Sequence, residues 1–234
     1  MEQVQGDLRD AESVAAACQG IDVVQHIGGI AGIWRAWQRF QGINVLGTGH
    51  VLDGCRAHGV RRLVFTSSPS VTFDGRSQEG IDESAPYSRR WLCHYPRSKA
   101  MAEKMVLDAS GDELLTCALR PHLIWGPHDN HLLPRLIRRA SSGRLRKVGR
   151  GENVIDMVYV ENAAHAQLQA ADRLQAESPV VGTKCLRKPA WLNNLLVPCN
   201  PPVTRLSPRR RMRHSLPRTT RQTMRNRPIM HPPI

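Results

Sequence analysis

Tyr95-Pro96-Arg97-Ser98-Lys99 is the stretch around which the rest of the sequence is organised. A tyrosine and a lysine four residues apart on a helix lie on one face. The lysine ammonium is expected to favour the phenolate and so to lower the pKa of Tyr95 toward neutral pH. Tyr95 is therefore a candidate proton donor or acceptor for an alcohol/carbonyl pair. The alternative is a surface tyrosine beside a solvated lysine.

A short apolar stretch precedes this segment and ends in two serines. Residues 62–66, Arg-Leu-Val-Phe-Thr, are expected to form a buried strand, with Ser67 and Ser68 at its carboxyl end. Ser68 stands 27 positions before Tyr95. A hydroxyl at this place can hydrogen-bond a substrate oxygen whose charge changes, whereas the alternative is a turn serine that caps the strand exit. Ser67 is the candidate if the register is off by one residue.

Strands and helices alternate along the sequence. Strands are expected at 21–27, 62–66 and 115–119, and residues 2–8 are expected to be the end of another strand followed by a turn. Helices are expected within 12–18, 34–58, 96–109, 132–142 and 162–173, and the helix at 132–142 is basic and amphipathic. This alternation predicts an α/β fold with a Rossmann-like, doubly wound parallel sheet, which binds ligands at the carboxyl ends of its strands.

The net charge of +13 is concentrated at the carboxyl end. Residues 184–234 hold 12 of the 33 Lys and Arg residues and no Asp or Glu, which leaves 33 − 12 = 21 basic against 20 acidic residues in 1–183. Nine of the 16 prolines also follow Thr183. We therefore expect a folded domain at 1–183 and a disordered basic tail at 184–234. A solvated tail is favoured over one that binds nucleic acid or anionic membrane, so no specific nucleic-acid partner is expected.

Other features bear on compartment and metal content. The six cysteines are scattered without a C-x-x-C pair, so neither a zinc site nor a disulfide framework is expected. No apolar run reaches the roughly 18 residues of a membrane span, and the amino terminus lacks the apolar core of a signal peptide. Buried free thiols are typical of a reducing compartment. These features predict a cytoplasmic protein without a metal or a transmembrane segment.

The order of strand, Ser-Ser, loop, Tyr-x-x-x-Lys and helix resembles the extended short-chain dehydrogenases/reductases. Within them the sequence is most similar to the 3β-hydroxysteroid dehydrogenase/isomerase branch, which includes sterol-4α-carboxylate 3-dehydrogenases and 2-alkyl-3-oxoalkanoate reductases. The resemblance runs from about Gly6 to about Gly182. It also rests on Asn-Val-Leu-Gly-Thr at 44–48, Arg-Pro-His-Leu-Ile-Trp-Gly-Pro at 120–127 and Val-Tyr-Val-Glu-Asn at 158–162.

The resemblance implies catalytic roles for four of these residues. Ser68 would hold the substrate oxygen, and Tyr95 would transfer the proton. Lys99 would lower the pKa of Tyr95 and bind the ribose of the cofactor, and Asn44 would support this relay. Ser98 is expected on the helix surface.

The resemblance also implies that NAD or NADP binds along the carboxyl ends of the strands. The residues it assigns to the cofactor are Asp7, Leu8, Gly28, Gly29, Tyr95, Lys99 and Pro121. Asp7 would accept from the adenine amino group, and its alternative is an Asp in a turn. Gly28 and Gly29 would let the backbone approach the cofactor closely, although most relatives have Ala-Ala there. Pro121 would lie near the nicotinamide.

One part of the family pattern is not found. The sequence contains no Gly-x-x-Gly-x-x-Gly loop, the segment that holds the pyrophosphate at a helix amino terminus. We therefore expect a truncated fold without the first β-α-β elements, including the residue that selects NAD or NADP. An open sheet edge and weak cofactor binding are the expected consequences.

Two classes of function remain open from the sequence. The first is an oxidoreductase of the 3β-hydroxysteroid dehydrogenase type. It would transfer hydride between NAD(P) and a secondary alcohol or ketone on a steroid or similar bulky lipid, with steroid biosynthesis as its setting and a homodimer as its assembly. A 2-alkyl-3-oxoalkanoate reductase-like enzyme is a variant of this class. The second is a catalytically silent fragment that acts as a non-enzymatic binding module.

Overall fold

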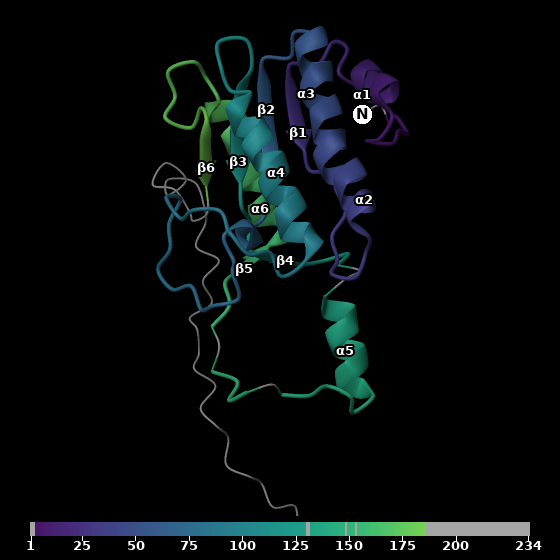
Figure 1. The fold of residues 1–234 in the computed structure, drawn as a ribbon, viewed down its shortest axis with the longest axis vertical. Coiled ribbons are helices and arrows are strands. Elements are labelled where there is room, and N and C mark those ends of the chain that lie inside the picture. The colour runs from purple at the N-terminus through teal and green to yellow at the C-terminus, as the bar shows by residue number, and fades with distance from the viewer. Residues whose placement is uncertain (1–2, 130–131, 148, 153, 186–234) are drawn as a thin grey trace, which may run out of the picture. The chain divides into compact units, whose positions relative to one another are not determined.

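A parallel sheet with the strand order β1-β2-β3-β6 forms the centre of the fold (Figure 1). The computed structural model describes residues 3–129, 132–147, 149–152 and 154–185. The strands of the sheet are β1 (Val23–His26), β2 (Arg62–Thr66), β3 (Leu115–Leu119) and β6 (Thr183–Cys185). A separate parallel pair consists of β4 (Leu123–Trp125) and β5 (Met157–Tyr159).

Helices connect these strands, as the parallel pairing requires. They are α1 (Ala11–Ala17), α2 (Trp37–Phe40), α3 (Gly47–Ala57), α4 (His94–Asp108), α5 (Leu133–Ser141) and α6 (Val160–Arg173). A π-helical segment, Gln41–Leu46, joins α2 to α3, and a 3-10 turn, Pro69–Val71, follows β2. Asp10 caps α1 by accepting from the backbone N–H groups of Glu12 and Ser13.

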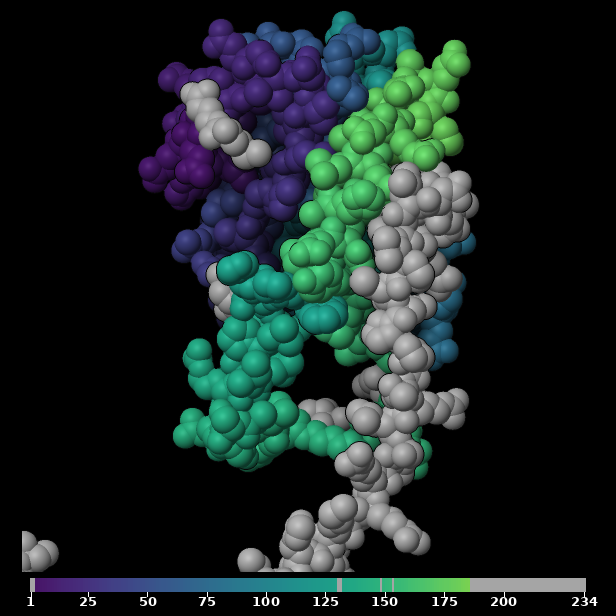
Figure 2. Space-filling view, turned by 180° about the vertical axis from the view of Figure 1, so that it is seen from behind, coloured from purple at the N-terminus to yellow at the C-terminus, as the bar shows by residue number. Residues whose placement is uncertain are grey.

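The alternation of side chains along β2 explains the layers. Leu63 and Phe65 point to one core, which α1, α3 and α4 cover, and Val64 points to the opposite core under α6. All three residues are fully buried. Figure 1 shows α3 and α4 on one face, and in the reverse view of Figure 2 the green helix α6 covers the other. The sheet therefore has helices on both faces, and the predicted Rossmann-like α/β fold is confirmed.

Several element boundaries differ from those expected. Residues 3–8 form no strand, and α4 begins at His94 rather than at Pro96. Lys184 and Cys185, which the sequence assigned to the tail, pair in the sheet, because Ala118 lies opposite Lys184 and Leu119 opposite Cys185. The rest of the predicted tail, 186–234, lies outside the described residues.

Strand β1 lies at one edge of the sheet. Among the described residues β1 pairs with β2 alone, so its other side has no strand partner there. Within the same part of the chain, every helix is too short or too polar to cross a lipid bilayer.

Candidate functional site

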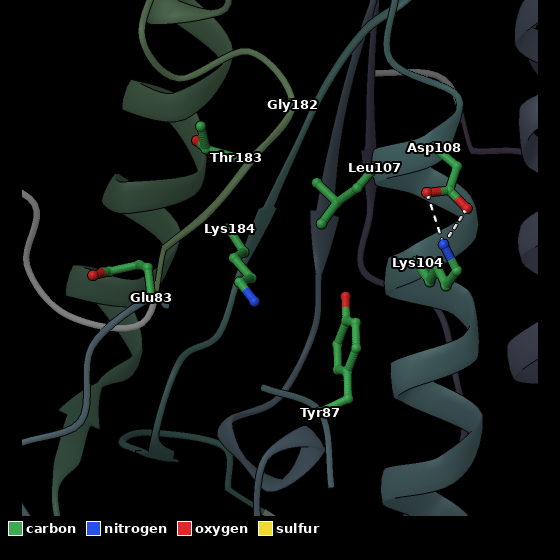
Figure 3. Close-up of a pocket in the computed structure, with 8 residues that line it drawn as sticks. All are labelled: Glu83, Tyr87, Lys104, Leu107, Asp108, Gly182, Thr183 and Lys184. Carbon is green, nitrogen blue, oxygen red and sulfur yellow. Dashed lines mark hydrogen bonds and ion pairs between the residues drawn. The ribbon is translucent and has the colours of Figure 1, made fainter. Parts of the chain in front are cut away.

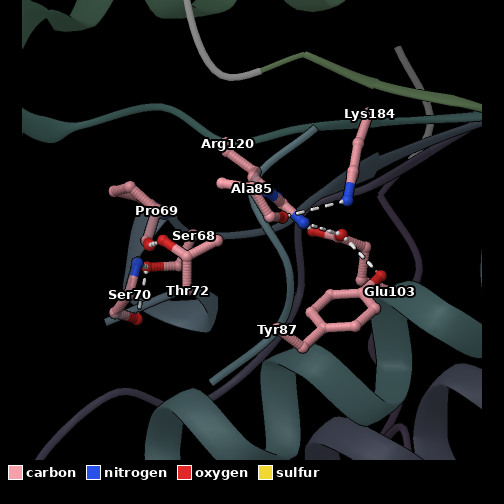
Figure 4. Close-up of polar contacts among 9 residues, drawn as sticks. All are labelled: Ser68, Pro69, Ser70, Thr72, Ala85, Tyr87, Glu103, Arg120 and Lys184. Carbon is pink, nitrogen blue, oxygen red and sulfur yellow. Dashed lines mark hydrogen bonds and ion pairs between the residues drawn. The ribbon is translucent and has the colours of Figure 1, made fainter. Parts of the chain in front are cut away.

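Ser68 and Tyr95 come together at the carboxyl end of β2. Tyr95 lies in the first turn of α4, and the hydroxyl of Ser68 acts on it as a hydrogen-bonding neighbour. Ser68 also caps the following turn, since its hydroxyl accepts from the backbone N–H of Ser70 at 3.3 Å and lies 2.8 Å from the Ser70 hydroxyl (Figure 4). Ser67 is buried, and its hydroxyl contacts no polar partner in the described part of the chain. The geometry favours Ser68 over Ser67 as the serine that faces Tyr95.

The pKa of Tyr95 moves opposite to the expectation. Burial raises it, and the interaction with Ser68 offsets this only in part. Lys99 does not lower it, because the ammonium of Lys99 donates to the carbonyl oxygen of Thr66 at 2.5 Å and lies 4.1 Å from the ring centroid of Phe65. The prediction that Lys99 lowers the pKa of Tyr95 toward neutral pH is therefore wrong. At neutral pH Tyr95 carries its proton, which is the state that a proton donor needs.

Lys99 is the buried cation of the site. The residue is only 5% exposed, and burial lowers its pKa from 10.5 to about 8, an effect that Glu103 opposes. A buried ammonium with three donors can hold hydroxyl groups of a ligand at the end of β2. This arrangement agrees with the ribose-binding role implied by the resemblance, which stays a prediction.

Lys99→Met should change how the free energy of unfolding depends on pH. Between pH 8 and 10.5 the unfolded chain keeps the proton on Lys99 and the folded chain loses it, so wild-type stability rises with pH in this window. The variant lacks this contribution. We expect its stability relative to wild type to fall by on the order of 3 kcal/mol from pH 8 to 10.5. Urea unfolding of both proteins measures this, and a constant difference across the window would contradict the buried, titrating lysine.

Asn44 supports the site from the π-helical segment, a feature common at functional sites. Its side-chain amide accepts from the backbone N–H of Ile30 at 2.8 Å and donates to the Ile30 carbonyl at 3.0 Å. It also donates to the Ser98 hydroxyl at 2.9 Å, which in turn donates to the Tyr95 carbonyl at 2.8 Å. Asn44 thus links the turn after β1 to the start of α4. Ser98 is fully buried, so its expected place on the helix surface is wrong.

A buried histidine completes this support. His26, the last residue of β1, lies 2.8 Å from the Thr48 hydroxyl through its Nε2 atom, and Thr48 donates to the Asn44 carbonyl at 2.7 Å. Burial and the nearby Lys99 ammonium lower the pKa of His26 to about 4. The imidazole is therefore neutral at physiological pH and acts as a fixed hydrogen-bonding group beside the site.

The residues predicted to bind the cofactor gather partly at the end of β1. A side-chain carbon added to Gly28 would lie 3.1 Å from Leu8, and one added to Gly29 would lie 3.1 Å from the side-chain oxygen of Asn44. Leu8 is held from the other side, since its backbone carbonyl hydrogen-bonds His50 at 2.8 Å. A side chain at Gly28 or Gly29 would therefore crowd Leu8 or Asn44.

Asp7 and Pro121, the other two residues predicted to bind the cofactor, lie in different surroundings. The carboxylate of Asp7 accepts from the backbone and guanidinium of Arg9, and these bonds lower its pKa to about 2. This is the turn geometry that was the alternative to adenine binding. Pro121 directly follows Arg120 at the end of β3, where the backbone N–H of Arg120 donates to the Cys185 carbonyl at 2.8 Å. It therefore also stands at the carboxyl edge of the sheet.

A buried ion pair that was not predicted from the sequence lies beside the site. Arg120 and Glu103, both with fully buried side chains, form two hydrogen bonds, one of 2.9 Å and one of 2.5 Å (Figure 4). The Tyr87 hydroxyl donates to the same carboxylate at 2.8 Å. The sequence contained a signal for the burial of Glu103. This residue follows Lys99 by four residues on α4 and so lies on the same buried face. This cluster joins α4, the end of β3 and the loop before α4.

A separate shallow pocket lies between the carboxyl half of α4 and β6 (Figure 3). It is lined by Glu83, Tyr87, Lys104, Leu107, Asp108, Gly182, Thr183 and Lys184. No predicted site residue lines it, and Lys104 is paired with Asp108 at 2.8 Å across one helical turn. We therefore place the candidate site at Ser68, Tyr95 and Lys99 and not in this pocket.

The chain is similar in sequence to proteins of a known family. The profile of the 3-beta hydroxysteroid dehydrogenase/isomerase family matches residues 1–185. A 2-alkyl-3-oxoalkanoate reductase from Shewanella oneidensis is 42% identical over 225 residues, which cover 88% of this chain and 57% of that protein. A sterol-4-alpha-carboxylate 3-dehydrogenase, decarboxylating, from Homo sapiens is 35% identical over 180 residues, covering 76% of this chain and 48% of that protein.

The fold has solved counterparts as well. The structure of MoeE5 in complex with UDP-glucuronic acid and NAD superposes with a TM-score of 0.62 at 27% identity, covering 75% of this chain and 60% of that one. The chain spans about half the length of the curated relatives named above. The match over residues 1–185, on a Rossmann-like sheet that carries the Ser68, Tyr95 and Lys99 constellation, shows that this chain belongs to the 3-beta hydroxysteroid dehydrogenase/isomerase family.

Proposed function

We propose that the whole protein is a nicotinamide-dependent reductase that converts a ketone on a bulky lipid into a secondary alcohol. A 2-alkyl-3-oxoalkanoate is the favoured substrate class. The single observation that carries the proposal is the meeting of Ser68, Tyr95 and Lys99 at the carboxyl end of β2, where Lys99 donates to the Thr66 carbonyl. A phenol that carries its proton at neutral pH can give it to an oxygen that gains negative charge, as the reduction of a carbonyl group requires.

Each residue has a role in this proposal. The cofactor supplies a hydride to the carbonyl carbon when it is bound. Ser68 donates a hydrogen bond to the carbonyl oxygen as charge develops there. Tyr95 transfers its hydroxyl proton to the same oxygen, so the C=O bond becomes CH–OH. Lys99 holds the ribose hydroxyls, and Asn44 fixes the turn after β1 against the start of α4.

The residues at the sheet edge fit a nicotinamide cofactor. Gly28, which lies against Leu8, and Gly29 would let a cofactor approach the backbone closely, and Lys99 adds an ammonium with donors to spare for a diol. The solved MoeE5 complex, which is 27% identical, contains NAD. NAD and NADP both remain candidates for this protein. The five described cysteines carry free thiols, which supports the proposed cytoplasmic location, and the homodimer stays a proposal.

A steroid is the second candidate substrate. The 35% identity to a human sterol-4-alpha-carboxylate 3-dehydrogenase favours it, whereas the 42% identity to the Shewanella oneidensis reductase favours the alkanoate. Oxidation of NADH and NADPH by the chain extended with a glycine-rich pyrophosphate loop, measured with a 2-alkyl-3-oxoalkanoate, a 3-oxosteroid and a short 3-oxo acid, separates the two. We expect the highest kcat/KM with the branched alkanoate. Turnover of none of the three would favour the silent binding module.

A further inference from the structure

Helix α5 carries an apolar face that is half-buried at Leu132 and Leu133 and exposed at Leu136 and Ile137. Leu132, Leu133, Leu136 and Ile137 fall at i, i+1, i+4 and i+5, a spacing that gathers them on one side of a helix. None of the residues of α5 is buried, and Ile137 is 65% exposed. The start of the helix is nevertheless well defined, because the Asp129 carboxylate accepts from the backbone N–H groups of Leu132 and Leu133 at 3.1 and 2.8 Å.

The opposite face of α5 and the segment after it are strongly basic. Residues 132–151 contain seven Lys and Arg residues and no Asp or Glu. All seven are exposed, and none forms an ion pair with another residue that the structure describes. They are Arg135, Arg138, Arg139, Arg144, Arg146, Lys147 and Arg150. A surface with this charge attracts an anionic partner.

Exposed apolar residues continue beyond the helix. Leu145 is 51% exposed, Val154 is 94% exposed and Ile155 is 67% exposed. The helix and this extension therefore offer apolar and cationic groups together over one stretch, residues 132–155. We call the described residues of this stretch, 132–147, 149–152, 154 and 155, the basic amphipathic segment.

Charge selects among the partners that could cover the segment. The remainder of this chain, 186–234, holds only basic ionisable residues apart from its histidines and one cysteine, so like-charge repulsion disfavours it. A second copy would bring the same seven cations against each other. A nucleic acid would satisfy the cations but not the apolar face of Leu136 and Ile137. An anionic lipid bilayer satisfies both, because its headgroups bind the cations and its acyl boundary takes the apolar side chains.

We propose that the basic amphipathic segment docks the protein on the surface of an anionic bilayer. Helix α5 would lie in the plane of the interface, with Leu136 and Ile137 directed into the acyl boundary. Arg135, Arg138 and Arg139 would contact lipid phosphates, to which guanidinium groups donate in pairs. The proposal stands on the composition and exposure of this segment and is independent of the catalytic assignment.

The test is co-sedimentation of the full chain with vesicles of phosphatidylcholine alone and of phosphatidylcholine mixed with phosphatidylglycerol. We expect binding to the mixed vesicles alone. Replacing Arg135, Arg138 and Arg139 by Gln should weaken it by about a hundred-fold. The double variant Leu136→Gln/Ile137→Gln, which keeps every charge, should weaken it by roughly ten-fold or more. All five side chains are on a helix without buried residues, so circular dichroism should remain unchanged.

Two matched controls make the outcome decisive. Leu168→Gln removes a side chain that is 60% exposed on α6, outside the segment, and should leave binding unchanged. A second control replaces the tail cluster Arg209, Arg210, Arg211 and Arg213 by Gln. The proposal is overturned if the tail control abolishes binding while the α5 variants bind like wild type. It is also overturned if Leu136→Gln/Ile137→Gln has no effect, because the segment would then bind polyanions through charge alone. A third contradicting result is that the α5 variants abolish a dimer seen by sedimentation velocity.

Discussion

Tyr95→Phe is expected to lower the turnover of ketone reduction by about 10²–10⁴-fold while the fold stays intact. The substitution removes only the hydroxyl that would give its proton to the substrate oxygen. The ring remains, and its contact with Phe40, with centroids 6.5 Å apart, should persist. Binding of the substrate should change far less than kcat, because proton transfer is an interaction of the transition state.

The assay needs a protein that can hold the cofactor. Because the sequence contains no glycine-rich pyrophosphate loop, the rates are compared in the chain itself and in a chimera. The chimera adds the glycine-rich pyrophosphate loop of the family pattern, with its flanking strand and helix, ahead of residue 1. Tyr159→Phe is the matched control, because it removes the same hydroxyl from a ring that packs against Trp125 at 5.2 Å. Equal kcat values for the Tyr95→Phe and Tyr159→Phe variants would show that Tyr95 does not transfer the proton.

Glu103→Gln should lower the free energy of unfolding by about 3–5 kcal/mol. The variant keeps the shape of the side chain but leaves the guanidinium of Arg120 without a counter-charge in a fully buried place. One nitrogen of Arg120 already has no hydrogen-bond partner within the described residues, so the cluster has little capacity to compensate. The Tyr87 hydroxyl would also lose its charged acceptor.

Lys104→Gln is the control for this prediction, and it lies at the next position of α4. It breaks the exposed pair with Asp108, whose two side chains are more than half exposed, so the loss should stay below about 0.5 kcal/mol (Figure 3). Guanidinium unfolding of the two variants beside wild type measures both. The double variant Glu103→Leu/Arg120→Met removes the charges together and should recover much of the loss. Similar stabilities for the Glu103→Gln variant and wild type would show that the pair is not desolvated.

The layers of the fold could be predicted from the sequence because short segments show which residues are apolar and how they are spaced. Leu63, Val64 and Phe65 form an apolar run of strand length, and the structure sends them alternately to the two cores. The pairing of Ser68 with Tyr95 was predicted across 27 positions from family resemblance, and the structure brings the two side chains together. Local pattern and motif order were sufficient for these features.

Features that depend on tertiary contacts were not predicted. The direction of the Tyr95 pKa depends on the depth of burial and on the bond from Lys99 to the Thr66 carbonyl, and neither is visible in a Tyr-x-x-x-Lys spacing. Ser98 was placed on the surface because serine is commonly exposed, whereas the Asn44 amide holds it in the interior. The partner of Glu103 is Arg120, which is distant in sequence and meets it only when β3 and α4 are packed.

The end of the folded part is determined by strand pairing, and the amino-acid composition did not predict it. Lys184 looks like a tail residue because it opens the basic, carboxylate-free stretch. In the structure its backbone pairs with β3, and its ammonium donates to the Ala85 carbonyl at 3.3 Å and lies 5.1 Å from the ring centroid of Tyr87. A strand of three residues, Thr183–Cys185, is too short to be recognised from its sequence alone.

The most direct test of the central claim is transfer of deuterium from a reduced cofactor that carries two deuterium atoms at C4 of the nicotinamide to a 2-alkyl-3-oxoalkanoate. Mass spectrometry of the alcohol formed by the chimera locates the label. Hydride transfer with protonation by Tyr95 predicts one deuterium on the former carbonyl carbon and an unlabelled hydroxyl, with product formed about 10²–10⁴-fold more slowly by the Tyr95→Phe variant. A product without deuterium on that carbon, or equal rates for the two proteins, would contradict the account.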